Sequence, residues 1–477
     1  MALIRLNEYE WEVPIKGDMR VPGKIFASDE IIEAVSAEET FKQVANVATL
    51  PGILKASFAM PDIHWGYGFP IGGVAAFDWK EGIVSPGGVG YDINCGVRLS
   101  GLGITEGDVR PKLSELVDAL FAHIPTGVGG TGHIRLNTKD EKKVLIQGAH
   151  WAVKNGYGSE SDLERIEDSG KIADADPDQV SERAIERGRD QLGTLGSSNH
   201  FLEIGVVDVI YDSQAAAAFG LFEHQVTVML HSGSRGLGYQ VCDDSLFTMT
   251  KHVKKIGIEL PDKQLSCAYI QSTEGQHYLS AMACAANYAF ANRQILMHLA
   301  EEVLLDVLHV SPRTLDMHLI YDICHNMAKK ETHLFNGEKR MVCVHRKGAT
   351  RAFPPGHPAL CDAYKPFGQP ILIPGDMGRA SYVLSGASIA MEKTFGSTCH
   401  GAGRRLSRTA AMKAGRGRAI QKELGEKGIM VRSRGRSTLS EEMPDAYKDV
   451  SKVVDVVHGA GLAKKVARIR PMGVIKG

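Results

Sequence analysis

The sequence predicts an α+β fold, in which one large domain (residues 1–477) contains mixed β-sheets with surrounding helices. Short β-branched runs such as GIVSPG, VTVMLH and PILIPG indicate strands that end in glycine-rich or polar loops. Longer stretches with helical spacing of apolar residues lie between these runs. Polar segments that carry His, Asn or Cys recur from residue 60 to residue 400. A site assembled from segments so far apart favours one domain over a string of modules.

Three segments between the strands have a distinct character. Residues 112–122 carry apolar side chains at helical spacing, and the Ala- and Leu-rich stretch 279–310 predicts one or two buried helices. Residues 154–190 are polar and charged, which predicts a surface excursion whose second half is helical. The chain shows no internal repeat and no low-complexity tract.

Composition restricts the class of protein and its partners. Hydrophobic residues make up 43% and charged residues 23% of the chain, which is typical of a soluble globular protein. The formal net charge of −1 means that any nucleic-acid site must be a local patch. The eight cysteines have irregular spacing and form no C-x-x-C pair, which favours a reducing compartment. The N-terminal segment lacks the apolar core of a signal peptide, and no apolar run is long enough to span a membrane. We therefore expect a cytoplasmic protein without a membrane partner.

The most informative segment is GGVGYDINCGVRL, residues 87–99, which places Asp92 and Cys95 three residues apart among four glycines. A thiolate beside a carboxylate suits a divalent transition metal, because sulfur selects softer ions and oxygen harder ones. Taken alone, the same pattern also suits a buried structural cysteine in a tight turn.

Histidine segments further along the chain favour the metal interpretation. Each is flanked by glycine or small polar residues, and they centre on His64, His200, His231, His325 and His400. Any one of them also suits a hydrogen-bonded structural histidine, but imidazole is the commonest transition-metal ligand and a frequent base or nucleophile. Together with Asp92 and Cys95 they predict a centre for Mn²⁺, Zn²⁺ or Fe²⁺. A bridging thiolate can hold two ions, an arrangement used for in-line phosphoryl displacement.

Other segments suit phosphate. HGAGRR (400–405) combines glycine-rich backbone, which cradles phosphate, with arginines, which pair with it. Residues 404–418 hold six basic side chains and no acidic one, so Arg404, Arg405 and Arg408 are candidate RNA contacts, although a solvated helix face has the same pattern. PGDMGRAS (374–381) is a further candidate nucleotide loop. The sequence contains no P-loop motif.

Seven motifs, in order, resemble those of the RtcB family of RNA-splicing ligases: DINCGVR, SSNHFLEI, HSGSRGLG, CHNMA, PGDMG, HGAGR and the terminal VIKG. The resemblance covers nearly the whole chain. It implies a ligase that joins RNA 2′,3′-cyclic-phosphate or 3′-phosphate ends to 5′-hydroxyl ends in tRNA splicing and RNA repair. The expected cofactors are GTP and two Mn²⁺ ions, held in a deep cleft with the basic patch at its mouth.

The resemblance also assigns residues. Asp92, Cys95 and His200 would hold one Mn²⁺, and Cys95, His231 and His325 the second, while His400 would be the nucleophile that takes GMP from GTP. The expected guanylate contacts are Asn199, Glu203, Asn326, Pro374, Gly375, Asp376, Met377, Ser381, Gly401, Ala402, Gly403 and Lys476. The implied steps are guanylylation of His400, hydrolysis of the cyclic phosphate, GMP transfer to the 3′-phosphate, and attack by the 5′-hydroxyl. Because only a neutral imidazole in the right tautomer attacks phosphorus, His400 needs a partner on its other nitrogen.

Two positions depart from the family pattern, and a third, Lys476, matches the family's guanine-site lysine at a place where the sequence alone gives it no role. Asp376 stands where a small neutral residue is expected, and a carboxylate near GTP phosphates would repel them unless it faces a metal or the guanine edge. Trp65 follows His64 where a polar residue is expected. Lys476 is the penultimate residue of the sequence given, where a lysine is ordinarily part of a frayed tail.

Two alternatives to the ligase remain at this stage. One is a metal-dependent cyclic phosphodiesterase without ligase activity, which needs no covalent nucleotide on His400. The other is a non-catalytic RNA-binding protein, for which the metal ligands would be dispensable. For the ligase, the expected partners are tRNA halves or broken RNA ends and the activating protein archease, and the expected state is a monomer.

Overall fold

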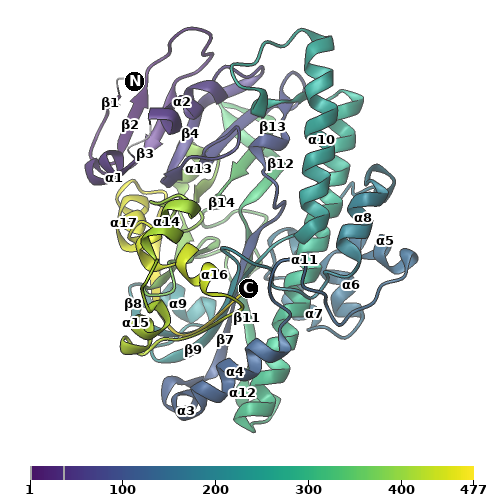
Figure 1. Ribbon diagram of the computed structural model, residues 1–477. Coiled ribbons are helices and arrows are strands. Elements are labelled where there is room, and N and C mark those ends of the chain that lie inside the picture. Colours follow the sequence, from purple (N-terminus) through teal and green to yellow (C-terminus); the bar gives the residue numbers. More distant parts are fainter. Residues whose placement is uncertain (1–2, 36–37) are drawn as a thin grey trace.

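Two large β-sheets form the centre of the computed structural model, which describes residues 3–35 and 38–477, and helices surround both sheets (Figure 1). Both sheets are mainly antiparallel, with parallel pairing between β3 and β4 in one and between β18 and β19 in the other. The predicted class, mixed sheets with surrounding helices, is confirmed.

The first sheet contains most of the N-terminal strands. Its seven strands are, in spatial order, β1 (Ile4–Arg5), β2 (Glu10–Val13), β3 (Gly23–Phe26), β4 (Ile53–His64), β5 (Ile71–Asp78), β13 (Glu338–Lys347) and β12 (Asn326–Phe335). A small sheet of β14 (Ala349–Arg351) and β17 (Ser397–Cys399) follows β13 and packs beside β4 and β5. Another joins β6 (Ile83–Val84) to β10 (Ala268–Tyr269).

The second sheet places most of the predicted site residues. Its strands are, in order, β11 (His318–Cys324), β7 (Gly96–Thr105), β9 (Gln225–Ser232), β8 (Phe201–Ile210), β19 (Ala463–Lys476), β16 (Ser381–Gly386) and β15 (Pro370–Ile373), with β18 (Met430–Ser433) beside β19. The middle strands are apolar runs that are buried along most of their length, as expected for strands covered on both faces. The runs VTVMLH, PILIPG and GIVSPG all contain strands, as predicted.

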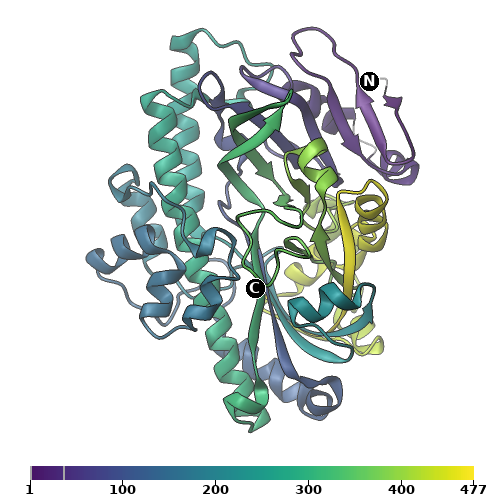
Figure 2. The ribbon, with the colours of Figure 1, turned by 180° about the vertical axis from the view of Figure 1, so that it is seen from behind.

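Two long helices cover one side of the molecule (Figure 1, Figure 2). They are α10 (Arg235–Ile256) and α11 (Thr273–Leu308), which pack against each other. Helix α11 begins where the Ser272 side chain accepts a hydrogen bond from the Gly275 N–H, and its small residues allow burial on all sides through the middle. The stretch predicted as one or two buried helices is therefore one helix of 36 residues.

The remaining helices are short. The predicted 112–122 helix is α4 (Leu113–His123), which packs on α11. The others are α1 (Asp29–Ala34), α2 (Glu38–Val47), α3 (Glu106–Val109), α5 (Thr138–Gln147), α6 (Ala149–Lys154), α7 (Glu160–Leu163), α8 (Glu182–Arg189), α9 (Ser213–Phe219), α12 (Pro312–Leu315), α13 (Ser388–Thr394), α14 (Arg408–Ala414), α15 (Ile420–Glu426), α16 (Arg436–Glu441) and α17 (Val450–Gly459).

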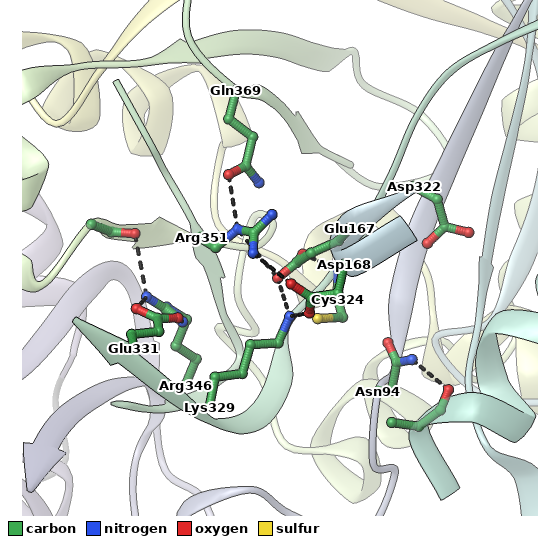
Figure 3. Close-up of polar contacts among 12 residues, drawn as sticks. Asn94, Glu167, Asp168, Asp322, Cys324, Lys329, Glu331, Arg346, Arg351 and Gln369 are labelled. Carbon is green, nitrogen blue, oxygen red and sulfur yellow. Dashed lines mark hydrogen bonds and ion pairs between the residues drawn. The ribbon is translucent and has the colours of Figure 1, made fainter. Parts of the chain in front are cut away.

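Residues 154–190 differ in part from the predicted surface excursion. Their second half contains α8, as predicted, and most of their side chains lie at the surface. However, one turn of this segment enters the interior, where Glu167 is buried. Glu167 and Asp168 both pair with the ammonium of Lys329, and Asp168 also accepts a hydrogen bond of 2.9 Å from Arg351 (Figure 3). The charge of this segment therefore partly neutralises buried cations, which composition alone does not reveal.

Two further observations concern the whole chain. All eight cysteines are free thiols, as their irregular spacing predicts. Within residues 3–35 and 38–477, no helix has both the length and the hydropathy needed to cross a membrane.

Candidate active site

The predicted metal ligands lie at one edge of the second sheet, where the ends of four neighbouring strands meet. Cys95 immediately precedes β7, His200 precedes β8, His231 is the penultimate residue of β9, and His325 follows β11. Because these neighbouring strands alternate in direction, two starts and two ends meet at the same edge, where Gly96 pairs with both Ser232 and Cys324. Antiparallel pairing therefore gathers ligands that are far apart in sequence.

One group of ligand atoms is formed by Cys95, His231 and His325, all buried. The Nε2 atom of His231 lies 3.2 Å from the Cys95 Sγ and 3.2 Å from the His325 Nε2. Burial lowers the pKa of both histidines well below the ordinary value, so each imidazole is neutral and keeps a lone pair. Three converging donors of this kind fit a divalent cation.

A second group shares the same thiol. Asp92 Oδ2 lies 2.8 Å from His200 Nε2, which is 3.4 Å from Cys95 Sγ, and the ligand atoms of these three residues lie within 4.8 Å of one another. Burial opposes ionisation of Asp92, but the hydrogen bond and charge of His200 keep its pKa below the usual range. Since Cys95 belongs to both groups, the arrangement fits two cations bridged by one thiolate.

Backbone groups next to the candidate ligands His200 and Asp92 orient their side chains. The Nδ1 atom of His200 lies 3.0 Å from the Leu195 carbonyl oxygen, and the Ser234 N–H donates to Asp92 Oδ1 at 3.0 Å. Fixing the second nitrogen of a histidine ligand sets its tautomer and directs the first nitrogen toward the cation.

His400 lies beside these groups, on a segment that packs against the first sheet. It follows β17, and its ring centroid is 4.7 Å from that of His325. Its backbone N–H donates to Asp62 Oδ2 at 3.0 Å, and its Nδ1 lies 2.6 Å from the same oxygen. Asp62, on β4, is fully buried. With Nδ1 protonated toward Asp62, Nε2 carries the free lone pair that a nucleophile requires.

A cavity of about 730 Å³ connects these groups with most of the predicted guanylate contacts. Its wall includes Asp92, Cys95, His231, His325, His400, Asn199, Glu203, Asn326, Pro374, Gly375, Asp376, Met377, Gly401, Ala402, Gly403 and Lys476. His200 and Ser381 are not part of this wall: His200 lies behind Asp92, and Ser381 accepts from the Gly375 N–H at 3.2 Å. Ser381 thus supports the loop that lines the cavity.

Asn326 also has a supporting position. Its Nδ2 donates to the Asp92 carbonyl oxygen at 3.0 Å, and its Oδ1 accepts from the Gly348 N–H at 2.9 Å. Both ends of the amide are therefore used within the protein, and it connects the two sheets at the metal-binding edge.

Lys476 is not part of a frayed tail. It ends β19, opposite Phe201 in the register, and its side chain is 5% exposed. Its Nζ donates to the Ser198 carbonyl oxygen at 3.2 Å and pairs with Glu442 at 3.3 Å. The last strand therefore carries this lysine into the cavity next to the start of β8, and the chain end lies in the middle of the molecule in both views (Figure 1, Figure 2).

The structure shows the surroundings of both residues that depart from the family pattern. Asp376 forms an ion pair of 2.7 Å with Arg379 and accepts from the Gly378 N–H, so its own loop balances much of its charge. Trp65 lies at the cavity wall with 57% of its surface exposed, and the neighbouring His64 places its Nδ1 3.0 Å from the Asp62 carbonyl oxygen.

The three candidate RNA arginines differ in how far they are engaged. Arg404 Nη1 pairs with buried Glu442 at 3.0 Å, and Nη2 donates to the Glu441 carbonyl oxygen at 2.8 Å, so its guanidinium is bound within the protein. Arg408 pairs with Glu441 at 2.9 Å but remains 61% exposed. All three line the cavity, and Arg405 donates no side-chain hydrogen bond among the described contacts. Acidic residues from 441–442 thus neutralise part of a patch that looked wholly basic in sequence.

Comparison with known proteins now connects this geometry to a family. A family model described as tRNA-splicing ligase RtcB matches residues 43–477. The chain is 55% identical over 479 residues to the tRNA-splicing ligase RtcB of Thermococcus kodakarensis, with 100% of this chain and 99% of that protein covered. It is 52% identical to the protein of that name from Archaeoglobus fulgidus, with the same coverage. The RNA-splicing ligase RtcB of Mycobacterium bovis is 52% identical over 91% of this chain and 100% of its own length. The chain belongs to the RtcB family.

Several site residues of this RtcB family member escaped the sequence reasoning. Asp62 is the most important of them. The sequence predicts a partner for the second nitrogen of His400 and draws attention to His64, but nothing in it pairs residue 62 with residue 400. Glu442, Tyr447 and Phe201 also line the cavity. Glu442 and Tyr447 lie in no glycine- or histidine-rich segment and become visible only through the fold, whereas Phe201 directly follows His200.

Glu203 gives a prediction about stability in this RtcB chain. Burial, together with the charge of Asp376, raises the pKa of its carboxyl to about 8, against the opposing effect of Lys476. Between pH 4.5 and pH 8 the unfolded chain therefore loses a proton that the folded chain keeps, so rising pH destabilises the wild type. We expect the stability advantage of Glu203→Gln over the wild type to grow across this window, by up to about 1.4 kcal/mol per pH unit. Denaturant unfolding at several pH values measures it.

The control for this measurement is Glu338→Gln, because Glu338 is an exposed glutamate on β13. Its difference from the wild type should stay constant with pH. A Glu203→Gln difference that is equally flat would show that the Glu203 carboxyl ionises normally in the folded protein.

Proposed function

We propose that this chain is a GTP- and Mn²⁺-dependent RNA ligase that joins 2′,3′-cyclic-phosphate or 3′-phosphate ends to 5′-hydroxyl ends in tRNA splicing and RNA repair. Membership of the RtcB family supports RNA ligation. The observation that carries the finer chemistry is the position of His400. Its Nδ1 is held by buried Asp62, and it shares one cavity with the thiol-bridged ligand groups.

The ligand groups fit the proposed metal ions. Asp92, Cys95 and His200 would hold one ion, and Cys95, His231 and His325 the other. The oxygen and nitrogen donors suit Mn²⁺, and the shared sulfur suits Zn²⁺ and Fe²⁺ as well. When bound, such ions neutralise phosphate oxygens and lower the pKa of a hydroxyl group.

His400 would act as the nucleophile. Asp62 accepts the Nδ1 proton, so Nε2 presents its lone pair to the α-phosphorus of GTP. Formation of the Nε2–P bond breaks the bond from phosphorus to the pyrophosphate oxygen, and pyrophosphate leaves. The Asp62 carboxylate balances the positive charge that develops on the ring. GMP then passes to the RNA 3′-phosphate, and the 5′-hydroxyl of the other RNA end displaces it.

The guanine base would lie near Glu203 and Lys476, at the part of the cavity where β8 and β19 pair. A carboxyl group accepts from the N–H groups of guanine, and an ammonium donates to its carbonyl oxygen. The 374–377 loop and residues 401–403 would contact the phosphates and ribose, while exposed Arg408 and Arg405 would contact RNA phosphates.

The two alternatives are not favoured. A cyclic phosphodiesterase forms no covalent nucleotide, and the relatives of this chain are named as tRNA-splicing ligases, which favours ligation. A non-catalytic RNA-binding protein gives no reason for the two complete ligand groups.

Ligation of defined RNA halves tests the proposal. Wild-type protein with GTP and MnCl₂ is expected to join a strand ending in a 2′,3′-cyclic phosphate to a strand beginning with a 5′-hydroxyl. Without GTP, only hydrolysis of the cyclic phosphate to a 3′-phosphate is possible. Hydrolysis with no joined product in the presence of GTP would instead indicate the phosphodiesterase.

The surroundings of the protein also belong to this proposal. A cytoplasmic location is predicted from the cysteine spacing and the N-terminal segment, and the family predicts a monomeric state and activation by archease. Mass measurement in solution and turnover with and without archease test the last two.

A further inference from the structure

Arg293 occupies an unusual place behind the candidate metal centre. It lies in the middle of α11, and its side chain is completely buried. Its Nη1 donates to the carbonyl oxygens of Asn94, at 2.7 Å, and Ser232, at 3.2 Å. Its Nη2 donates to Asn94 Oδ1 at 3.1 Å and to Asp322 Oδ1 at 2.8 Å, and its Nε donates to the same carboxylate at 3.0 Å.

The partners of Arg293 share one property: each belongs to a segment that carries a metal ligand. Asn94 lies between Asp92 and Cys95, Ser232 follows His231, and Asp322 precedes His325 by three residues. Figure 3 shows Asp322 and Asn94 on neighbouring segments of this region. A single side chain from outside the sheet therefore joins the three strands whose ends carry Cys95, His231 and His325.

The geometry uses the full hydrogen-bonding capacity of arginine. A guanidinium has five N–H donors in a rigid plane, and the contacts given above provide an acceptor for each. Burial of the charge is balanced by Asp322, whose own side chain is fully buried. Gly96 allows the approach, because a Cβ at that position would lie 2.9 Å from the Arg293 Cζ. Lysine has three donors on a single nitrogen and no fixed plane, so it cannot make the five contacts that the three nitrogens of Arg293 make.

A neighbouring arginine shows that charge balance alone does not explain this arrangement. Arg98 is 1% exposed and also pairs with Asp322, through Nη1 at 3.2 Å. Its other strong contact is with Gln294 Oε1 at 2.6 Å, and its Nε has no partner among the described residues. Arg98 lies on β7 itself, and its side chain balances the same carboxylate without contacting Asn94 or Ser232.

We propose that Arg293 is a positioning residue of the metal centre, which holds the segments of Cys95, His231 and His325 at the separation that lets one thiolate serve two cations. The inference rests on the proposed function, since it concerns the metal centre of that function. It goes further by assigning the placement of the ligands to one buried side chain on a different element. Loss of an outer partner of this kind typically weakens metal binding by about 10- to 100-fold.

Metal binding to Arg293→Lys tests the inference, with Arg98→Lys as the matched control. Co²⁺ is titrated into each full-length protein in competition with a chelator, and the thiolate-to-Co²⁺ absorption band reports the environment of Cys95. We expect Arg293→Lys to bind Co²⁺ about 10- to 100-fold more weakly and with an altered band. Arg98→Lys is expected to match the wild type in both measurements.

The outcomes separate the inference from the proposed function. A wild type that binds no Co²⁺ or Mn²⁺ would contradict the metal centre itself. A wild type that binds two ions, together with an Arg293→Lys variant of equal affinity and identical band, would overturn the positioning role alone. So would equal weakening by both variants, since that would trace the effect to Asp322 and general packing.

A second variant covers the case in which Arg293→Lys does not fold. Asn94 has a φ of 51°, which glycine also adopts, so Asn94→Gly keeps the backbone and removes the side-chain acceptor of Arg293 Nη2. Weaker Co²⁺ binding at an unchanged unfolding temperature supports the inference. Unchanged binding would overturn it.

Discussion

GTP radiolabelled at its α-phosphate is expected to label the wild-type protein in the presence of MnCl₂, and His400→Ala is expected to take up no label. The reason is that His400 lies in the cavity wall and has its Nδ1 fixed by the carboxylate of buried Asp62. A phosphoramidate is labile in acid and stable in base, so a denaturing gel after each treatment identifies the bond. Label that persists in His400→Ala would place the nucleophile elsewhere.

Asp62→Asn separates the nucleophile from its orienting partner. An asparagine amide can donate to Nδ1 and so favours the tautomer that protonates Nε2. We expect the rate of labelling to fall by about 10²- to 10⁴-fold, the usual contribution of a positioned acid–base partner. The number of bound metal ions should not change, because Asp62 belongs to neither ligand group. Labelling at the wild-type rate would mean that Asp62 serves only to hold the backbone N–H of His400.

Cys95→Ser is expected to weaken both metal sites together, because Cys95 is the one residue common to both ligand groups. A serine hydroxyl remains protonated near neutral pH and is a far poorer ligand than a thiolate. Equilibrium dialysis against Mn²⁺ followed by metal analysis should give two ions per wild-type chain and none per Cys95→Ser chain at the same free concentration.

His325→Ala is the matched control for this prediction. His325 belongs to one ligand group, so its removal should leave the ion held by Asp92, Cys95 and His200. A Cys95→Ser chain that still holds one ion with wild-type affinity would show that the thiolate does not bridge. Circular dichroism of each variant confirms that the fold is retained.

The candidate ligand residues could be named from sequence because their chemistry is visible locally. Asp92 and Cys95 stand out as a carboxylate and a thiol in a glycine-rich segment, and the histidines follow strand-like runs. The strands themselves were predictable from β-branched apolar runs, and α4 and α11 from helical spacing. The order in which the strands pair was not predictable. Residues 96, 232 and 324 meet through backbone hydrogen bonds, which form whatever the side chains are.

Charged residues were the least predictable part of the site. The 404–418 segment is wholly basic in sequence, yet Arg404 is bound by Glu442. Residues 154–190 appeared to form a surface segment, yet Glu167 is buried against Lys329 and Arg351 (Figure 3). Composition predicts that such charged side chains are exposed. In the structure they are held in ion pairs, because a distant segment of the chain supplies the opposite charge.

The sequence by itself determined which chemistry this protein can perform: a thiol, a carboxylate and several imidazoles for metal ions, a histidine in a glycine-rich loop for the nucleotide, and the family to which these motifs belong. Only the tertiary structure decided which group orients which. The contact of Asp62 with His400 spans 338 residues, and that of Arg293 with Asn94 spans 199. Both contacts depend on how strands and a helix pack, and packing is decided by burial over the whole chain, which no local pattern of residues encodes.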